Sequence, residues 1–168
     1  MNYDLQSFPK IDPRQEWRVI GLTLLAAFLL KQIPWHGWAL LFRPDFVLIV
    51  LLFWAQRRQD GISFGLAFAL GLVTDVQDGV VLGQHALAYC AGVFLVQHFR
   101  RRLFMFTLWR QAMQIFPLLL LAEVAALVVG WVSTRTPQPG WVLATSFTGT
   151  LLWLIVAYAG KMPAARTE

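Results

Sequence analysis

The run Ala112–Trp131, AMQIFPLLLLAEVAALVVGW, contains only one charged side chain, that of Glu123. A helix needs about 20 mainly apolar residues to cross roughly 30 Å of hydrocarbon, and this run meets that length. Similar runs, separated by short polar breaks, fill most of the chain. We therefore expect an all-α membrane protein, a bundle of six transmembrane helices at residues 17–33, 44–56, 61–74, 80–97, 112–131 and 141–160.

The overall composition agrees with this expectation. The chain has 168 residues, of which 58% are hydrophobic and 14% are charged, whereas a soluble domain carries about 25% charged residues. We expect a transmembrane domain at 17–160, with short cytoplasmic tails at 1–16 and 161–168. The net charge is +5, and the basic residues lie at span ends, which indicates contact with anionic membrane lipids rather than with nucleic acid.

The distribution of Lys and Arg predicts the orientation of the spans. Positive charge is costly to translocate, so cytoplasmic loops collect basic residues. If the N-terminus is cytoplasmic, only Lys31, Arg43 and Arg135 of the 14 basic residues fall on the outer side. We therefore expect a multi-pass protein of the bacterial inner membrane with both termini in the cytoplasm.

The second and third expected spans are short for a bilayer. Runs of 13 or 14 residues are also compatible with a re-entrant hairpin, which enters and leaves the membrane on one face. A hairpin entering from the outer face would carry Arg57 and Arg58 into the membrane. The charges therefore favour two true crossings.

Small residues recur at helical spacing on two of the spans. Helices in a membrane associate by close packing of such residues, so we expect the third and fifth spans to form the centre of the bundle. The rows serve only the fold, or they form a dimer seam or a docking face for the helix of another protein. They consist of Gly61, Gly65 and Ala69, of Ala67 and Gly71, and of Ala122, Ala126 and Gly130.

Glu123 is an acid well inside a span, where a charge costs roughly 2.5–3.5 kcal/mol on insertion scales. It is either a ligand or coupling site, or one side of a buried hydrogen bond between the fifth and sixth spans. The sixth span offers Thr145, Ser146, Thr148 and Thr150 as partners.

The break between the third and fourth spans holds Asp75, Asp78 and His85, together with Gly79 and Gly83. Such glycines allow a tight turn, and aspartates there commonly cap helices. Two or three metal-binding side chains without a fuller set are weak grounds for a metal site, so we expect no metal and no cofactor.

Catalytic motifs are nearly absent. Gly61-Ile62-Ser63-Phe64-Gly65 matches the G-x-S-x-G pattern of serine hydrolases, but it lacks the strand that precedes such a nucleophile. His85 is the only candidate base for Ser63. We therefore expect a protein that is not an enzyme.

A series of short motifs resembles the MreD family of bacterial rod shape-determining membrane proteins. The series covers roughly residues 43–112, and its order and spacing carry the resemblance more than any single motif. It consists of Arg43-Pro44-Asp45 before an apolar run ending at Trp54, Gly61 with Gly65, Gly71-Leu72, Asp75, Gly79, Leu82-Gly83, His85-Ala86-Leu87 and Leu108-Trp109-Arg110-Gln111-Ala112.

The resemblance implies a non-enzymatic component of the cell-elongation machinery. Members of this family associate with MreC and act with the MreB filament and the synthases of lateral-wall peptidoglycan. The family is also similar in fold to the six-helix substrate-binding subunits of ECF-type vitamin transporters. This leaves a second hypothesis, a carrier subunit in which Glu123 and His85 line a pocket for a vitamin-like compound.

The resemblance and the residue pattern together nominate a partner-binding site or pocket. We expect the transmembrane helix of MreC to dock on a small-residue face, with Arg43, Asp45 or Asp75 contacting its outer juxtamembrane part. Self-association of the chain is a further option. The nominated residues are Arg43, Pro44, Asp45, Asp75, Gly83, His85 and Glu123.

Overall fold

The computed structural model describes residues 13–34, 36–37, 42–58, 62–104, 108–134 and 142–161. Within these ranges the chain forms six α-helices and no strand, which confirms the expected all-α class. The helices are α1 (Pro13–Lys31), α3 (Phe46–Arg57), α4 (Phe64–Asp78), α5 (Gln84–Phe104), α6 (Leu108–Thr134) and α7 (Val142–Lys161).

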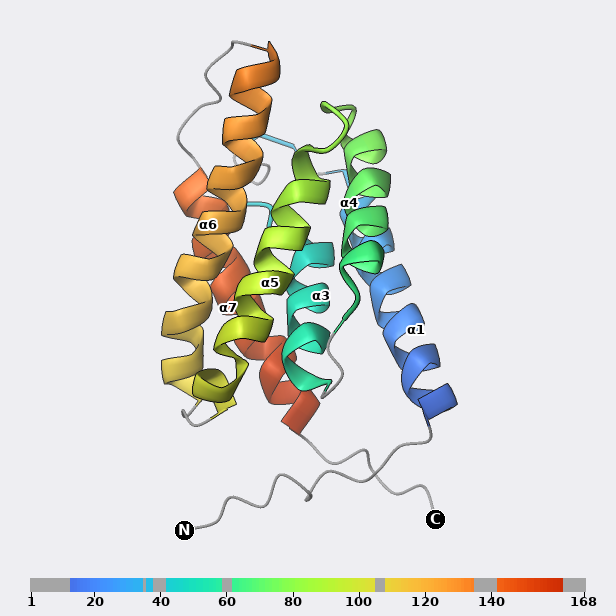
Figure 1. Cartoon of the computed structure of the whole chain (residues 1–168), viewed down its shortest axis with the longest axis vertical. Helices are drawn as coiled ribbons and strands as arrows, with labels where there is room; N and C mark the ends of the chain where they lie inside the picture. The colour runs from blue at the N-terminus through green and yellow to red at the C-terminus, as the bar shows by residue number, and fades with distance from the viewer. Residues whose placement is uncertain are drawn as a thin grey trace.

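Successive helices run up and down, so that α1 begins and α7 ends at the same end of the bundle (Figure 1). This end also receives the C-termini of α3 and α5 and the N-termini of α4 and α6. We call it the arginine end, because it carries Arg14, Arg18, Arg57, Arg58, Arg100 and Arg110.

Local capping explains where the short helices begin and end. Asp45 has extended backbone and accepts hydrogen bonds from the Val47 and Leu48 amides, so α3 starts at Phe46. Ser63 caps α4 in the same way, through the Leu66 amide, which starts that helix three residues later than expected. The α4 helix continues past Thr74 to Asp78 and stops at Gly79, whose φ of +64° is left-handed.

The centre of the bundle differs from the expectation based on small residues. We expected the third and fifth spans, α4 and α6, at the centre, but this is wrong. The α3 helix is the most enclosed: Val47, Leu52 and Ala55 are fully buried, and α3 packs against α1, α5 and α7. The α5 helix contacts α3, α4 and α6. Aliphatic side chains on α3, rather than glycine rows, fill the interior.

The small residues fall into two groups. A methyl group on Gly71 would lie 2.3 Å from Ala86 Cα, so this glycine permits the closest approach of α4 to α5. Ala122 and Ala126 are buried, and Gly130 faces Gln84. Gly65 and Ala69 instead lie on an exposed face of α4, with nothing within 4 Å of a methyl group built on Gly65. Gly61 lies outside the described residues.

Large apolar side chains cover the outside of the bundle. They are exposed on every outer helix, whereas the described exposed set contains none from α3; examples are Leu25, Phe68, Phe94, Leu121 and Ile155. In the described part of the chain, one helical segment, Trp109–Ser133, is both long and apolar enough to cross a membrane. Phe46–Arg57 and Ala144–Tyr158 are shorter apolar helices.

Candidate functional site: a polar network at one end of the bundle

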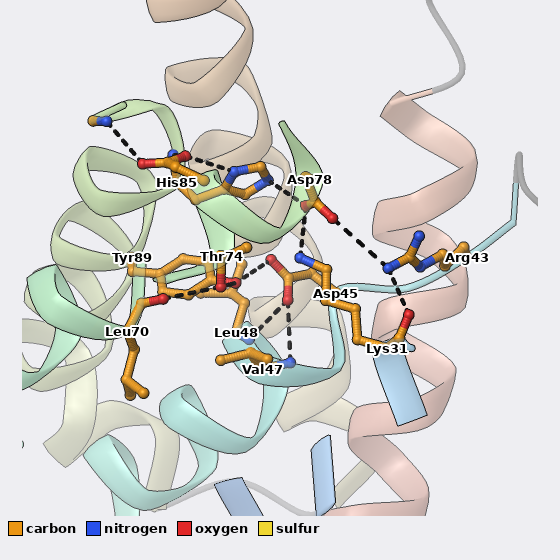
Figure 2. A network of polar contacts seen from close by, with 12 residues as sticks. Lys31, Arg43, Asp45, Val47, Leu48, Leu70, Thr74, Asp78, His85 and Tyr89 are labelled. Carbon is orange, nitrogen blue, oxygen red and sulfur yellow. Dashed lines mark hydrogen bonds and ion pairs between the residues drawn. The ribbon is translucent and has the colours of Figure 1, made fainter. Parts of the chain in front are cut away.

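A network of polar side chains lies at the end opposite the arginine end, which we call the network end (Figure 2). Its first part is centred on Asp45. One carboxylate oxygen of Asp45 caps α3, and the other accepts a 2.7 Å hydrogen bond from the Tyr89 hydroxyl. Thr74 Oγ1 lies 3.2 Å from the same hydroxyl and donates to the Leu70 carbonyl. These bonds connect α3, α4 and α5 through buried groups.

The second part is the turn between α4 and α5, which is organised by Asp75. Its carboxylate accepts hydrogen bonds from the backbone amides of Gly83 (2.8 Å) and His85 (2.7 Å) and from His85 Nδ1 (2.9 Å). Gly83 has a φ of +101°, a conformation that side chains disfavour. The Asp75 carboxylate therefore fixes the turn, which agrees with the capping role weighed for this aspartate.

The third part is an ionic cluster around Asp78. The Asp78 carboxylate lies 2.7 Å from Lys31 Nζ, 3.9 Å from an Arg43 nitrogen and 3.8 Å from His85 Nε2. Arg43 also donates to the Lys31 carbonyl at 2.9 Å. Figure 2 shows Asp78 between the His85 ring and the two basic side chains. The cluster joins the C-terminal end of α1 to the last turn of α4.

Burial separates the interior of this network from its accessible edge. Asp75 and Thr74 are fully buried, and the Lys31 side chain is only 5% exposed. Pro44 is buried next to Asp45. The Arg43 and Asp78 side chains are each 24% exposed. Arg43 and Asp78 therefore belong to the accessible edge of the network.

Glu123 stands apart from these bonds, on α6. Its side chain forms a hydrogen bond with that of Thr145 on α7. The sequence offered such a bond between the fifth and sixth spans as the alternative to a ligand or coupling site. Asp45 and Lys31 are close enough for their charges to act on Glu123. The carboxyl group therefore belongs to the same half of the bundle as the network.

The structure does not assemble the serine–histidine pair considered for catalysis. Ser63 caps α4 at the arginine end, whereas His85 binds Asp75 near the other end of that helix. Twelve residues separate positions 63 and 75, which is about 18 Å along a helix axis. In the described residues, no group of three or more His, Cys, Asp and Glu side chains is arranged to hold a metal ion.

A cavity of about 250 Å³ lies between α1, α3 and α7, and no side chain of the network lines it. Apolar atoms line it almost throughout, and its lining includes Ala26, Phe53 and Leu152. Neither Glu123 nor His85 lines this cavity, so it is not the pocket that the carrier hypothesis requires.

Sequence reasoning missed three members of the network: Lys31, Thr74 and Tyr89. Lys31 is buried and pairs with Asp78, although its place at a span end indicated only a role in topology. Tyr89 is a polar aromatic residue inside an apolar run, and such hydroxyls usually find a partner when buried. That rule could have identified it, but not its partner Asp45, which lies 44 residues earlier.

Two comparisons with known proteins agree on one family. The family model for the rod shape-determining protein MreD matches residues 14–159. A rod shape-determining protein MreD of Haemophilus influenzae is 27% identical over 139 residues, which cover 82% of this chain and 85% of that protein. No solved structure matches the chain.

Proposed function

Because the chain belongs to the MreD family of rod shape-determining proteins, we propose that it is a non-enzymatic, six-span inner-membrane component of the cell-elongation system that binds MreC. In this role it helps to regulate peptidoglycan synthesis together with MreB and the lateral-wall synthases. The family match carries the part of this proposal that concerns cell shape. The distribution of apolar, basic and small residues supports the rest.

The placement of polar and apolar residues supports six crossings. Apolar side chains face outward, while Asp75, Thr74 and Lys31 are buried, the reverse of a soluble helical protein. The α3 and α4 helices have 12 and 15 residues, which correspond to about 18 and 22 Å. Both are shorter than the hydrocarbon core. Their basic and polar ends, such as Arg57 and Asp78, would reach the interfaces by local thinning of the bilayer.

The exposed face of α4 is the best candidate for docking the MreC transmembrane helix. Within the described residues, α4 makes extensive contacts only with α5, and Gly65 and Ala69 present a flat strip between exposed Phe68 and Val73. Small residues on a lipid-facing strip let another helix approach closely. Arg43 and Asp78, at the network end of the bundle, would contact the part of MreC that leaves the membrane.

Co-purification with MreC in mild detergent tests this docking face. We expect Gly65→Leu to reduce MreC recovery at least severalfold, because the added side chain would hold the partner helix away from α4. Gly21→Leu is the matched control, since Gly21 is also a helical glycine with nothing within 4 Å. Equal recovery of MreC with both variants would contradict the assignment of the face, and failure of the unaltered protein to recover MreC would contradict the proposed function.

A further inference from the structure

The apolar cavity between α1, α3 and α7 has no part in the proposed docking of MreC. Its walls come from Ala26 and Leu30 of α1, from Ile49 and Phe53 of α3, and from Val156 of α7. It is partly open, and α1 and α7 make no extensive contact with each other within the described residues, so in a spanning bundle the opening between them faces the lipid. Either a lipid chain or a segment of another protein would fill a recess of this kind.

The polar groups in the cavity wall are already satisfied within the protein. Trp54 Nε1 donates a 3.0 Å hydrogen bond to Thr23 Oγ1, and the Thr23 hydroxyl lies 2.9 Å from the carbonyls of Val19 and Ile20. A ligand inside the cavity therefore meets hydrocarbon and aromatic surface. This environment fits an alkyl chain and gives no hydrogen bonds to a polar small molecule.

Two arginines follow the cavity-lining part of α3 toward the arginine end. The Arg57 guanidinium lies 5.7 Å from the centre of the Phe53 ring, and Phe53 lines the cavity. The neighbouring Arg58 guanidinium lies 4.3 Å from the ring of Trp17 on α1, and one of its nitrogens is 3.9 Å from a Glu16 oxygen. Arginine presents several N–H groups in a fork that matches phosphate.

We propose that this cavity holds one acyl chain of an anionic glycerophospholipid from the leaflet at the arginine end, with the lipid phosphate bound by Arg57. The inference rests on the proposed membrane-spanning arrangement. It adds a specific lipid contact on the side of the bundle formed by α1, α3 and α7, distinct from the α4 face assigned to MreC.

Native mass spectrometry of the full-length protein in detergent tests the lipid site. The probes are phosphatidylglycerol and phosphatidylcholine with identical acyl chains. We expect tighter binding of phosphatidylglycerol, and Arg57→Gln should weaken it about fivefold, as expected for one basic residue near a lipid surface. Arg57→Lys, which keeps the charge, should retain most of the binding. Ala26→Phe should weaken the binding of both lipids, because the ring would occupy the cavity.

Matched variants separate this site from general attraction to charge. Arg110 is an exposed arginine at the same end of the bundle but on α6, so Arg110→Gln should leave phosphatidylglycerol binding unchanged. Equal weakening by Arg57→Gln and Arg110→Gln, equal affinity for the two lipids, or unchanged binding by Ala26→Phe would each overturn the proposal. Co-purification of a tightly bound protein that Ala26→Phe displaces would also overturn the proposal.

MreC recovery distinguishes failure of this inference from failure of the proposed function. Ala26→Phe and Arg57→Gln should co-purify with MreC as the unaltered protein does. Gly65→Leu should keep the lipid and lose MreC. Loss of both properties in all three variants would contradict the separation of the two surfaces.

Discussion

Asp75 is the residue on which the polar network most depends. Its two carboxylate oxygens accept three N–H bonds from the turn that connects α4 to α5. The group is fully buried, so water does not replace a lost bond. A buried acid near a span end is easily interpreted as a functional site from sequence. Here its hydrogen bonds hold the turn between α4 and α5 and the ring of His85.

Asp75→Asn should therefore destabilise the protein by about 1–3 kcal/mol, because the amide offers one acceptor oxygen and leaves at least one donor of the turn unsatisfied. Tyr89→Phe is a matched comparison in the same network. It removes one hydroxyl but leaves the Asp45 cap on α3, so we expect a smaller loss, about 1 kcal/mol. Thermal unfolding in detergent measures both variants. A larger effect for Tyr89→Phe than for Asp75→Asn would contradict this ranking.

Gly71 is the residue that sets the spacing of α4 and α5. Gly71→Ala would place a methyl group 2.3 Å from Ala86 Cα, a backbone atom that cannot rotate away. We expect a loss of about 1–3 kcal/mol from this overpacking. Gly65→Ala provides the control, because its methyl group meets nothing within 4 Å and alanine favours helix by about 1 kcal/mol. Equal unfolding temperatures for Gly71→Ala and Gly65→Ala would contradict the close approach of α4 to α5 at Gly71.

At the scale of the elements, Glu123 and Thr145 connect α6 to α7. If the carboxyl group serves mainly as a hydrogen-bonding partner, Glu123→Gln should preserve stability and the ability to restore rod shape in cells lacking the protein, because an amide can still bond Thr145. Glu123→Leu should lose that bond. A Gln variant that folds and inserts normally but fails to restore rod shape would instead indicate that the charge itself is needed.

The helices were more predictable than their packing. Hydropathy placed all six, and local rules explain the ends of the short ones, where Asp45, Ser63 and Gly79 cap or stop the chain. Packing depends on contacts between distant residues that no local pattern reports. The row containing Gly65 and Ala69 looks like a core seam in sequence, yet it lies outside the bundle. The interior is built by aliphatic residues of α3, which show no periodicity because the sequence of that helix is apolar on every side.

The candidate site was predictable as a set of residue types but not as a network. The motif series nominated Arg43, Asp45, Asp75, Gly83 and His85, and the structure brings these residues to one end of the bundle. Their links pass through Tyr89 and Lys31, which the motif series does not contain. Asp75 is fully buried and cannot contact a partner directly, whereas the Arg43 side chain is partly accessible. The sequence does not reveal this difference in burial.

At the scale of the whole molecule, the bundle is polarised along its long axis. Arginines gather where α1 begins and α7 ends. The carboxylates of Asp45, Asp75 and Asp78 gather at the opposite end, where Figure 2 shows Asp45 and Asp78. Exposed apolar side chains lie between these ends. This arrangement is the physical basis for placing the arginine end in the cytoplasm, the MreC contact at the network end and on α4, and the lipid contact beside α1.

Cysteine labelling on the two sides of α5 tests the six-span arrangement directly. In a Cys90→Ala background, single cysteines replace Leu82, in the exposed turn before α5, or Arg110, in the first turn of α6. A membrane-impermeant maleimide applied to intact spheroplasts should label Leu82→Cys and should label Arg110→Cys only after permeabilisation. Labelling of both positions from the same side would mean that α5 does not cross the membrane, and it would contradict the six-span arrangement.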